Sequence, residues 1–156
     1  MATSKAGGKN TDAVSEKLSK AVADTYALLA KTHYYHWNVE GPRFLTLHQL
    51  FEEQYNELFA AADELAERLR ALKVYAPGGL GQFKALTSIA EPGPMPIKAE
   101  QMIADLQHDN ELMSKLCQEL IEATDEAGDD VTNDIMIGRK TAHDKAAWML
   151  RANLAA

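Results

Sequence analysis

Four side chains in the segment 44–72 have the types and the spacing of metal ligands on a helix. His48 and Glu52 are four residues apart, and so are Asp63 and Glu67. Residues four apart share one helix face, so each pair can hold an ion. Imidazole and carboxylate ligands suit iron(II), with zinc, manganese and cobalt as competitors. The segment therefore predicts metal binding.

The two pairs are too far apart to hold one ion within a single helix. Glu52 and Asp63 are eleven residues apart, which is about 16 Å at 1.5 Å per residue. Both pairs are nevertheless symmetric about a point between Glu57 and Leu58. An identical helix crossing antiparallel at this point would place each pair against the opposite pair of a second copy. The spacing predicts two metal sites per dimer, each shared between subunits.

The same helix face carries Tyr55, Phe59 and Ala62, which we expect to form the apolar centre of the dimer contact. Taken singly, the ligand types have ordinary structural explanations. An acidic pair at this spacing usually lies on a solvated face, and a lone histidine on an apolar stripe usually belongs to a core. The common centre of symmetry favours the metal site.

A preceding helix is predicted from about Asp12 to Asn38. One stripe of it carries Leu18, Val22, Thr25, Leu29, His33 and His36. His36 should point into the bundle and join the cluster of His48. His33, one turn earlier, fits either a residue that supports the ligands or plain core. Trp37 fits either packing or electron donation to an oxidising metal.

Glycines and prolines divide the rest of the chain into further helices. We expect helices at about 44–72, 97–124 and 129–155, with a short helical segment within 83–89 in the long connection. Such a connection is long enough to return along a bundle. The predicted fold is all-α: a ferritin-like four-helix bundle over residues 12–156, with a short extra helix in the crossover between helices two and three. Residues 1–11 read as a flexible tail.

The third and fourth long helices should pack through apolar stripes. The predicted core residues are Ile103, Leu106, Met113, Cys117 and Leu120 in the third, and Ile135, Ala142, Ala146 and Met149 in the fourth. A single cysteine excludes a disulfide framework and is typical of a cytoplasmic protein. The chain contains no apolar run of membrane-spanning length, and residues 1–12 lack the apolar region of a signal peptide. His108 and His143 stand apart from other ligand types, and no role is predicted for them.

Two further patterns bear on metal chemistry. No Glu-x-x-His motif is present, although a di-iron site inside one bundle is built from such motifs; its absence supports sites between subunits. Asp125, Asp130 and Asp134 belong to an acidic concentration around Gly128. Spacing alone favours helix capping for these carboxylates, while copies gathered around a symmetry axis would form a negative funnel for cations.

Four motifs resemble those of the Dps family, the mini-ferritins named as DNA-binding proteins from starved cells. They are His36-Trp37-Asn38-Val39-x-Gly41-Pro42-x-Phe44, Leu47-His48-x-x-Phe51-Glu52, Asp63-x-x-Ala66-Glu67-Arg68, and Asp125-Glu126-Ala127-Gly128-Asp129 with Trp148-Met149-Leu150. The resemblance covers about residues 14–154. It implies a dodecameric shell that oxidises iron(II), preferentially with hydrogen peroxide, and stores the ferric product inside, which would protect DNA from oxidative damage.

The resemblance also implies roles for individual residues. His36, His48 and Glu52 would come from one subunit, and Asp63 and Glu67 from its two-fold mate. Asp125, Asp130 and Asp134 match acidic residues of the family's three-fold iron-entry pores, which replaces capping as the expected role, and Trp37 matches a tryptophan beside the iron site. The family often has Asp where this chain has Glu52, so the carboxylate here reaches about one methylene further.

Two rival functions remain from the sequence. Lys5 and Lys9 allow a nucleoid protein that compacts DNA through its tail, although twelve copies of a chain with formal charge −7 would repel DNA. The other rival is a helical bundle that binds zinc for assembly only. The ferroxidase is favoured because it uses all five ligands together.

Overall fold

The computed structural model describes the backbone of residues 6–155 and the side chains of residues 11–155. It contains five helices and no strand in this part of the chain. The helices are α1 (Ala6–Asn38), α2 (Phe44–Ala71), α3 (Leu80–Leu86), α4 (Ala99–Ala127) and α5 (Asp130–Leu154). The predicted all-α fold with a short crossover helix is confirmed. No described helix is long and apolar enough to cross a membrane.

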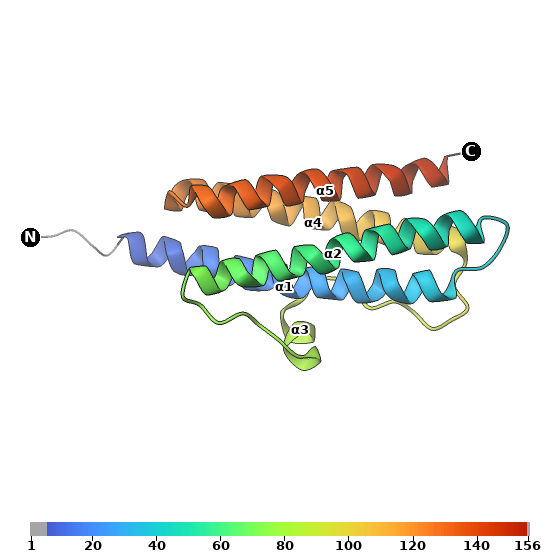
Figure 1. The fold of residues 1–156 in the computed structure, drawn as a ribbon, viewed down its shortest axis with the longest axis horizontal. Coiled ribbons are helices and arrows are strands. Elements are labelled where there is room, and N and C mark those ends of the chain that lie inside the picture. Colours follow the sequence, from blue (N-terminus) through green and yellow to red (C-terminus); the bar gives the residue numbers. More distant parts are fainter. Residues whose placement is uncertain (1–5, 156) are drawn as a thin grey trace, which may run out of the picture.

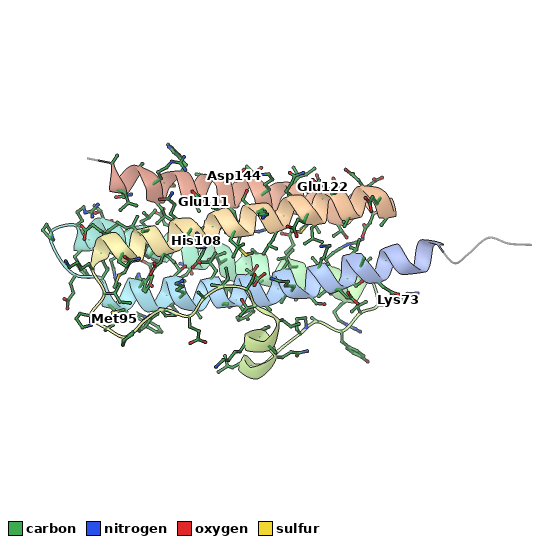
Figure 2. The ribbon with its side chains drawn as sticks, turned by 180° about the vertical axis from the view of Figure 1, so that it is seen from behind. Lys73, Met95, His108, Glu111, Glu122 and Asp144 are labelled. Atoms are coloured by element: carbon green, nitrogen blue, oxygen red, sulfur yellow. The ribbon has the colours of Figure 1, made fainter. Side chains whose placement is uncertain are left out.

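The four long helices lie side by side along one axis, and α3 stands off to one side (Figure 1). α1 and α2 form one antiparallel pair, and α4 and α5 form the other. The crossover runs along the bundle between α2 and α4, so that α4 packs against α1, as the view from behind also shows (Figure 2). The two pairs are therefore joined by a long connection, which is the topology that the sequence predicted.

The helix boundaries follow the predicted punctuation, except at the amino end. α1 begins at Ala6, where the sequence predicted a start near Asp12. Of the predicted tail, residues 1–5 lie outside the described part of the chain. α4 ends at Ala127, and the capping residue Gly128 has a left-handed φ of 69°, which favours glycine. Asp129 then caps α5 by accepting a hydrogen bond from the Thr132 backbone N–H at 3.0 Å.

The core is formed as predicted on α4 but not on α5. All five predicted core residues of α4 are buried. On α5 the predicted apolar stripe is wrong, because its four residues are only partly buried. The buried face lies one residue further along, at Thr132, Met136, Arg139, His143, Ala147 and Leu150. Three of these six positions, Thr132, Arg139 and His143, are polar or charged, so the buried face of α5 carries no continuous apolar pattern.

A buried carboxylate anchors the crossover to α1. Asp24 is fully buried and accepts hydrogen bonds from the Ser88 backbone N–H at 2.6 Å and from Thr87 Oγ1 at 2.8 Å. The rings of Tyr26 and Phe83 stack with centroids 4.6 Å apart, which holds α3 against α1. The connection is thus fixed to α1 at several points.

Candidate metal centre

Two histidines hold each other in place where α1 ends and α2 begins. The Nδ1 of His36 lies 2.7 Å from the backbone carbonyl oxygen of His48, and the Nδ1 of His48 lies 2.8 Å from that of His36. The two rings stack with centroids 3.7 Å apart and an angle of 15° between their planes. The short turn after Val39 brings the two residues together, as the sequence predicted.

The reciprocal hydrogen bonds determine which ring nitrogen is open. A carbonyl oxygen only accepts hydrogen bonds, so each Nδ1 must carry its proton and donate it. In the neutral imidazole the other nitrogen, Nε2, then has an unshared electron pair. Neither Nε2 has a hydrogen-bond partner among the described residues. Both rings therefore present the atom that binds metals, in an orientation fixed by the backbone.

Aromatic side chains surround this histidine pair. Phe44 packs against the His48 ring with centroids 5.0 Å apart, and Tyr55 meets the His36 ring edge-on at 5.1 Å. His33 lies between Trp37 and Tyr55, at 4.0 Å and 4.3 Å. Burial, helped by the neighbouring His36, lowers the pKa of His33. His33 thus contacts the groups that pack around the pair, which fits a supporting position rather than the deep core.

The three predicted carboxylates lie on the solvent-exposed side of α2. Glu52, Asp63 and Glu67 are all exposed, and none of them forms an ion pair within residues 11–155. The part of the chain with described side chains contains no group of three or more histidines, cysteines or acids able to hold a metal. Among the described residues, one copy of the chain therefore brings His36 and His48 together but provides no ion-pair partner for the three carboxylates.

Large apolar side chains are exposed on the same side as these carboxylates. Phe59 is 63% exposed, Leu45 62% and Trp37 61%. Phe59 and Tyr55 agree with the predicted apolar centre of a contact between copies. Ala62 does not, because it is 1% exposed and points into the bundle core. The helix is rotated so that position 62 shares the core face with Leu58 and Leu65.

The acidic turn divides into capping and exposed carboxylates. Asp129 caps α5 and pairs with Arg68 at 2.9 Å, so the capping explanation holds for this residue, which was not among the three predicted pore residues. Asp125, Asp130 and Asp134 are exposed. Asp125 accepts a hydrogen bond from Asn133 Nδ2 at 3.0 Å.

A second polar cluster lies inside the bundle and was not predicted. His143 and Arg139 lie on the buried face of α5, where the sequence assigned no role to His143. The sequence feature that indicates this cluster is the spacing of Arg139 and His143, because residues four apart share a helix face. It was overlooked because neither residue is apolar.

Comparison with known proteins agrees with this fold. The architecture is that of a ferritin-like domain, and the model of the ferritin-like domain family matches residues 15–156. The DNA protection during starvation protein 2 of Bacillus anthracis is 38% identical over 141 residues, which are 90% of this chain and 96% of that protein.

Two solved structures are also similar. Dps from Thermosynechococcus elongatus superposes with a TM-score of 0.93 at 30% identity. The match covers 97% of this chain and 96% of the Thermosynechococcus chain. A Dps protein from Vibrio cholerae O1, described as a member of a broad superfamily of ferritin-like diiron-carboxylate proteins, gives a TM-score of 0.89 at 26% identity over 94% of this chain and 92% of its own. The chain belongs to the Dps family of ferritin-like proteins.

Proposed function

We propose that this protein is a ferroxidase and an iron store, and that its metal sites form between two-fold related copies. The observation that carries the proposal is the pair of fixed imidazoles, His36 and His48, each with an open Nε2. The ferritin-like diiron-carboxylate description of a structural relative supports iron as the metal. In the family shell, a dodecamer, the ferric product would be stored inside and DNA protected from oxidative damage.

The exposed carboxylates complete the proposed site from a second copy. Asp63 and Glu67 of one copy would hold the first iron with His36 of the other, while His48 and Glu52 support a second position. None of these carboxylates forms an ion pair with a side chain of residues 11–155, which supports this assignment, since no cation in that part of the chain competes for them. An antiparallel crossing of two α2 helices at the point between Glu57 and Leu58 would bring these groups together.

The chemistry follows from two irons held close together. Two iron(II) ions each give one electron to hydrogen peroxide, and with two protons the products are two iron(III) ions and two water molecules. Because both electrons are delivered at one site, no hydroxyl radical is released. Oxygen is the alternative oxidant, and zinc, manganese or cobalt would compete for the same ligands. Trp37, whose ring packs against His33, would supply an electron to a bound peroxide that has received only one.

Iron would reach the shell interior through acidic pores. Asp125, Asp130 and Asp134 are exposed near the turn between α4 and α5, as pore residues gathered around a three-fold axis must be. A ring of carboxylates attracts cations and raises their local concentration.

The decisive experiment removes the carboxylates that come from the second copy. Apoprotein is loaded with iron(II) without oxygen, peroxide is added, and the ferric absorbance is followed. Asp63→Ala with Glu67→Ala should abolish the fast phase. The matched control is Glu53→Ala with Glu64→Ala, which removes two exposed acids of α2 that are not in the proposed ligand set. An unchanged rate in the first variant would reject the proposal.

Two other functions give different results in simple assays. DNA binding through the tail is a separate prediction, motivated by Lys5, which lies outside the described residues, and by Lys9, whose side chain is not described. Absence of a gel shift at low salt removes it, because phosphate contacts are strongest there. A zinc-binding assembly protein would bind metal stoichiometrically and show no turnover of iron.

A further inference from the structure

A positively charged side chain lies in the middle of the helical bundle. Arg139 of α5 is only 6% exposed, and its side chain contacts polar groups of α2 and α5. Its neighbours are His143 of α5, which is 1% exposed, and Glu57 of α2. Behind His143 lies Asn110 of α4, which is 4% exposed.

Every hydrogen bond of this cluster leads away from Arg139, which is the donor to both Glu57 and His143. Both terminal nitrogens of Arg139 donate to the carboxylate of Glu57, the Nη2–Oε2 pair at 3.1 Å. Nη2 also lies 3.1 Å from His143 Nε2. A guanidinium can only donate, so His143 Nε2 accepts and its Nδ1 carries the proton. That proton is donated to Asn110 Oδ1 at 2.9 Å. Burial, helped by Arg139, lowers the pKa of His143 to about 3, so the ring is neutral at ordinary pH.

The atoms that face the guanidinium are those that bind metal ions. They are two carboxylate oxygens and one imidazole nitrogen, contributed by α2 and α5. Ferritin-like di-iron sites are built from the same ligand types, projecting inward from the helices of one bundle. Imidazole and carboxylate are ordinary ligands of zinc and iron. In this chain the guanidinium of Arg139, a cation of the protein itself, already occupies the position between these atoms.

The arrangement is not one that stability alone favours. Arg139 Nε is buried without a hydrogen-bond partner among the described residues. A buried donor without a partner lowers stability, and a buried ion pair is often no better than apolar side chains of the same volume. Glu57, with 47% of its side chain exposed, opens the cluster toward solvent, so an ion from outside could reach it.

We propose that the guanidinium of Arg139 takes the place of a metal ion inside the bundle, and that it keeps metal out of the subunit interior. Arg139 is then a specificity-determining residue, since metal ions bind between subunits and not within them. That metal ions bind between subunits rests on the proposed function. That Arg139 keeps metal ions out of the bundle does not. Removing the side chain would leave the open electron pair of His143 Nε2 facing a carboxylate across an empty space.

The test counts metal ions with cobalt(II) as the probe. Full-length apoprotein is titrated by calorimetry, and the visible spectrum of bound cobalt is recorded. Compared with the unmodified protein, Arg139→Ala should bind about one additional cobalt per subunit, with a new visible band from imidazole coordination. The additional ion should disappear again in Arg139→Ala with His143→Ala. Arg139→Lys keeps a cation in the cluster and should bind no additional ion.

The matched control is Lys145→Ala, which removes an exposed cation from the same helix. This control shows whether additional cobalt binds because the position of the Arg139 side chain is empty or only because the protein has lost one positive charge. If Arg139→Ala does not assemble with normal helix content, Arg139→Gln is measured in its place, because glutamine retains part of the side-chain volume.

The proposal is overturned if the assembled variant binds no more cobalt than Lys145→Ala, or if the additional ion survives the loss of His143. Iron oxidation by the unmodified protein is measured separately, so a failure of the proposed function would be recognised independently.

Discussion

The histidines at the α1–α2 turn and the histidine inside the bundle share one feature and differ in another. His36, His48 and His143 each donate from Nδ1 to an oxygen atom of the chain. At the turn the second nitrogen, Nε2, is open in both rings, and exposed carboxylates lie on α2, the helix of His48. In the bundle the second nitrogen accepts from Arg139. The same side chain thus has an open Nε2 at the turn and an occupied Nε2 inside the bundle.

The difference shows that residue type alone does not make a ligand. All three rings have a fixed tautomer, which is a requirement for ordered metal binding. What separates them is the group that faces Nε2. An open nitrogen can bind a cation, while a guanidinium already supplies one. The following predictions test this contrast, from the largest expected effect to the smallest.

Removal of both imidazoles at the turn should have the largest effect. In His36→Ala with His48→Ala, the affinity for cobalt(II) should fall by more than about 100-fold, because directly coordinating groups are lost. The affinity is measured by calorimetry. His108→Ala is the control, since His108 is an exposed histidine of α4 (Figure 2). Equal affinities in the two variants would show that the turn does not hold the metal.

The buried histidine should instead control stability in acid. In the folded state His143 stays neutral down to a pKa of about 3, while in the unfolded chain it takes up a proton near 6.5. The unfolded state therefore binds more protons below pH 6.5, and stability falls as the pH falls. This residue should contribute a slope of about 1.4 kcal/mol per pH unit between these values.

The slope is measured from urea unfolding at several pH values and one fixed protein concentration, because assembly also stabilises the chain. His143→Gln removes the titrating group and should flatten the curve below pH 6.5. If the unmodified protein and the variant lose stability in parallel, the buried ring is not neutral as described.

Glu52 should affect only the second metal position. In Glu52→Ala we expect the weaker phase of a cobalt titration to shift by about tenfold, since one of its ligands is lost, while the stronger phase is retained. Glu53→Ala removes the adjacent exposed carboxylate, which is not in the proposed ligand set, and should leave both phases unchanged. A shift of the stronger phase in Glu52→Ala would reverse the two assignments.

His33 should have the smallest effect, because it contacts the surrounding rings and not the metal. His33→Ala should weaken cobalt binding by less than about tenfold. It should also change the fluorescence of Trp37, whose ring centroid lies 4.0 Å away. The measurement is made in a Trp148→Phe background, so that only one indole emits. A loss as large as that of the double imidazole variant would make His33 a ligand.

The fold, and the meeting of His36 with His48, were predictable from local chemistry. Glycines and prolines mark the helix ends, and the symmetric spacing about Leu58 requires only the helical repeat. The hydrogen bonds between His36 and His48 were not predictable, because they depend on backbone carbonyls that meet only after the turn has folded. The buried face of α5 was misassigned for a related reason: Arg139 and His143 occupy core positions, so a search for apolar periodicity selects the adjacent residues.

The central claim is that each metal site requires two copies of the chain, and subunit mixing tests it directly. One variant carries His36→Ala with His48→Ala, and the other carries Asp63→Ala with Glu67→Ala; each assembly alone should be inactive. When the two are unfolded together and reassembled in equal amounts, half of the two-fold pairs are mixed, and each mixed pair regains one complete site of its two. About one quarter of the unmodified iron oxidation rate should return. No recovery in assemblies shown to contain both variants would contradict the shared site.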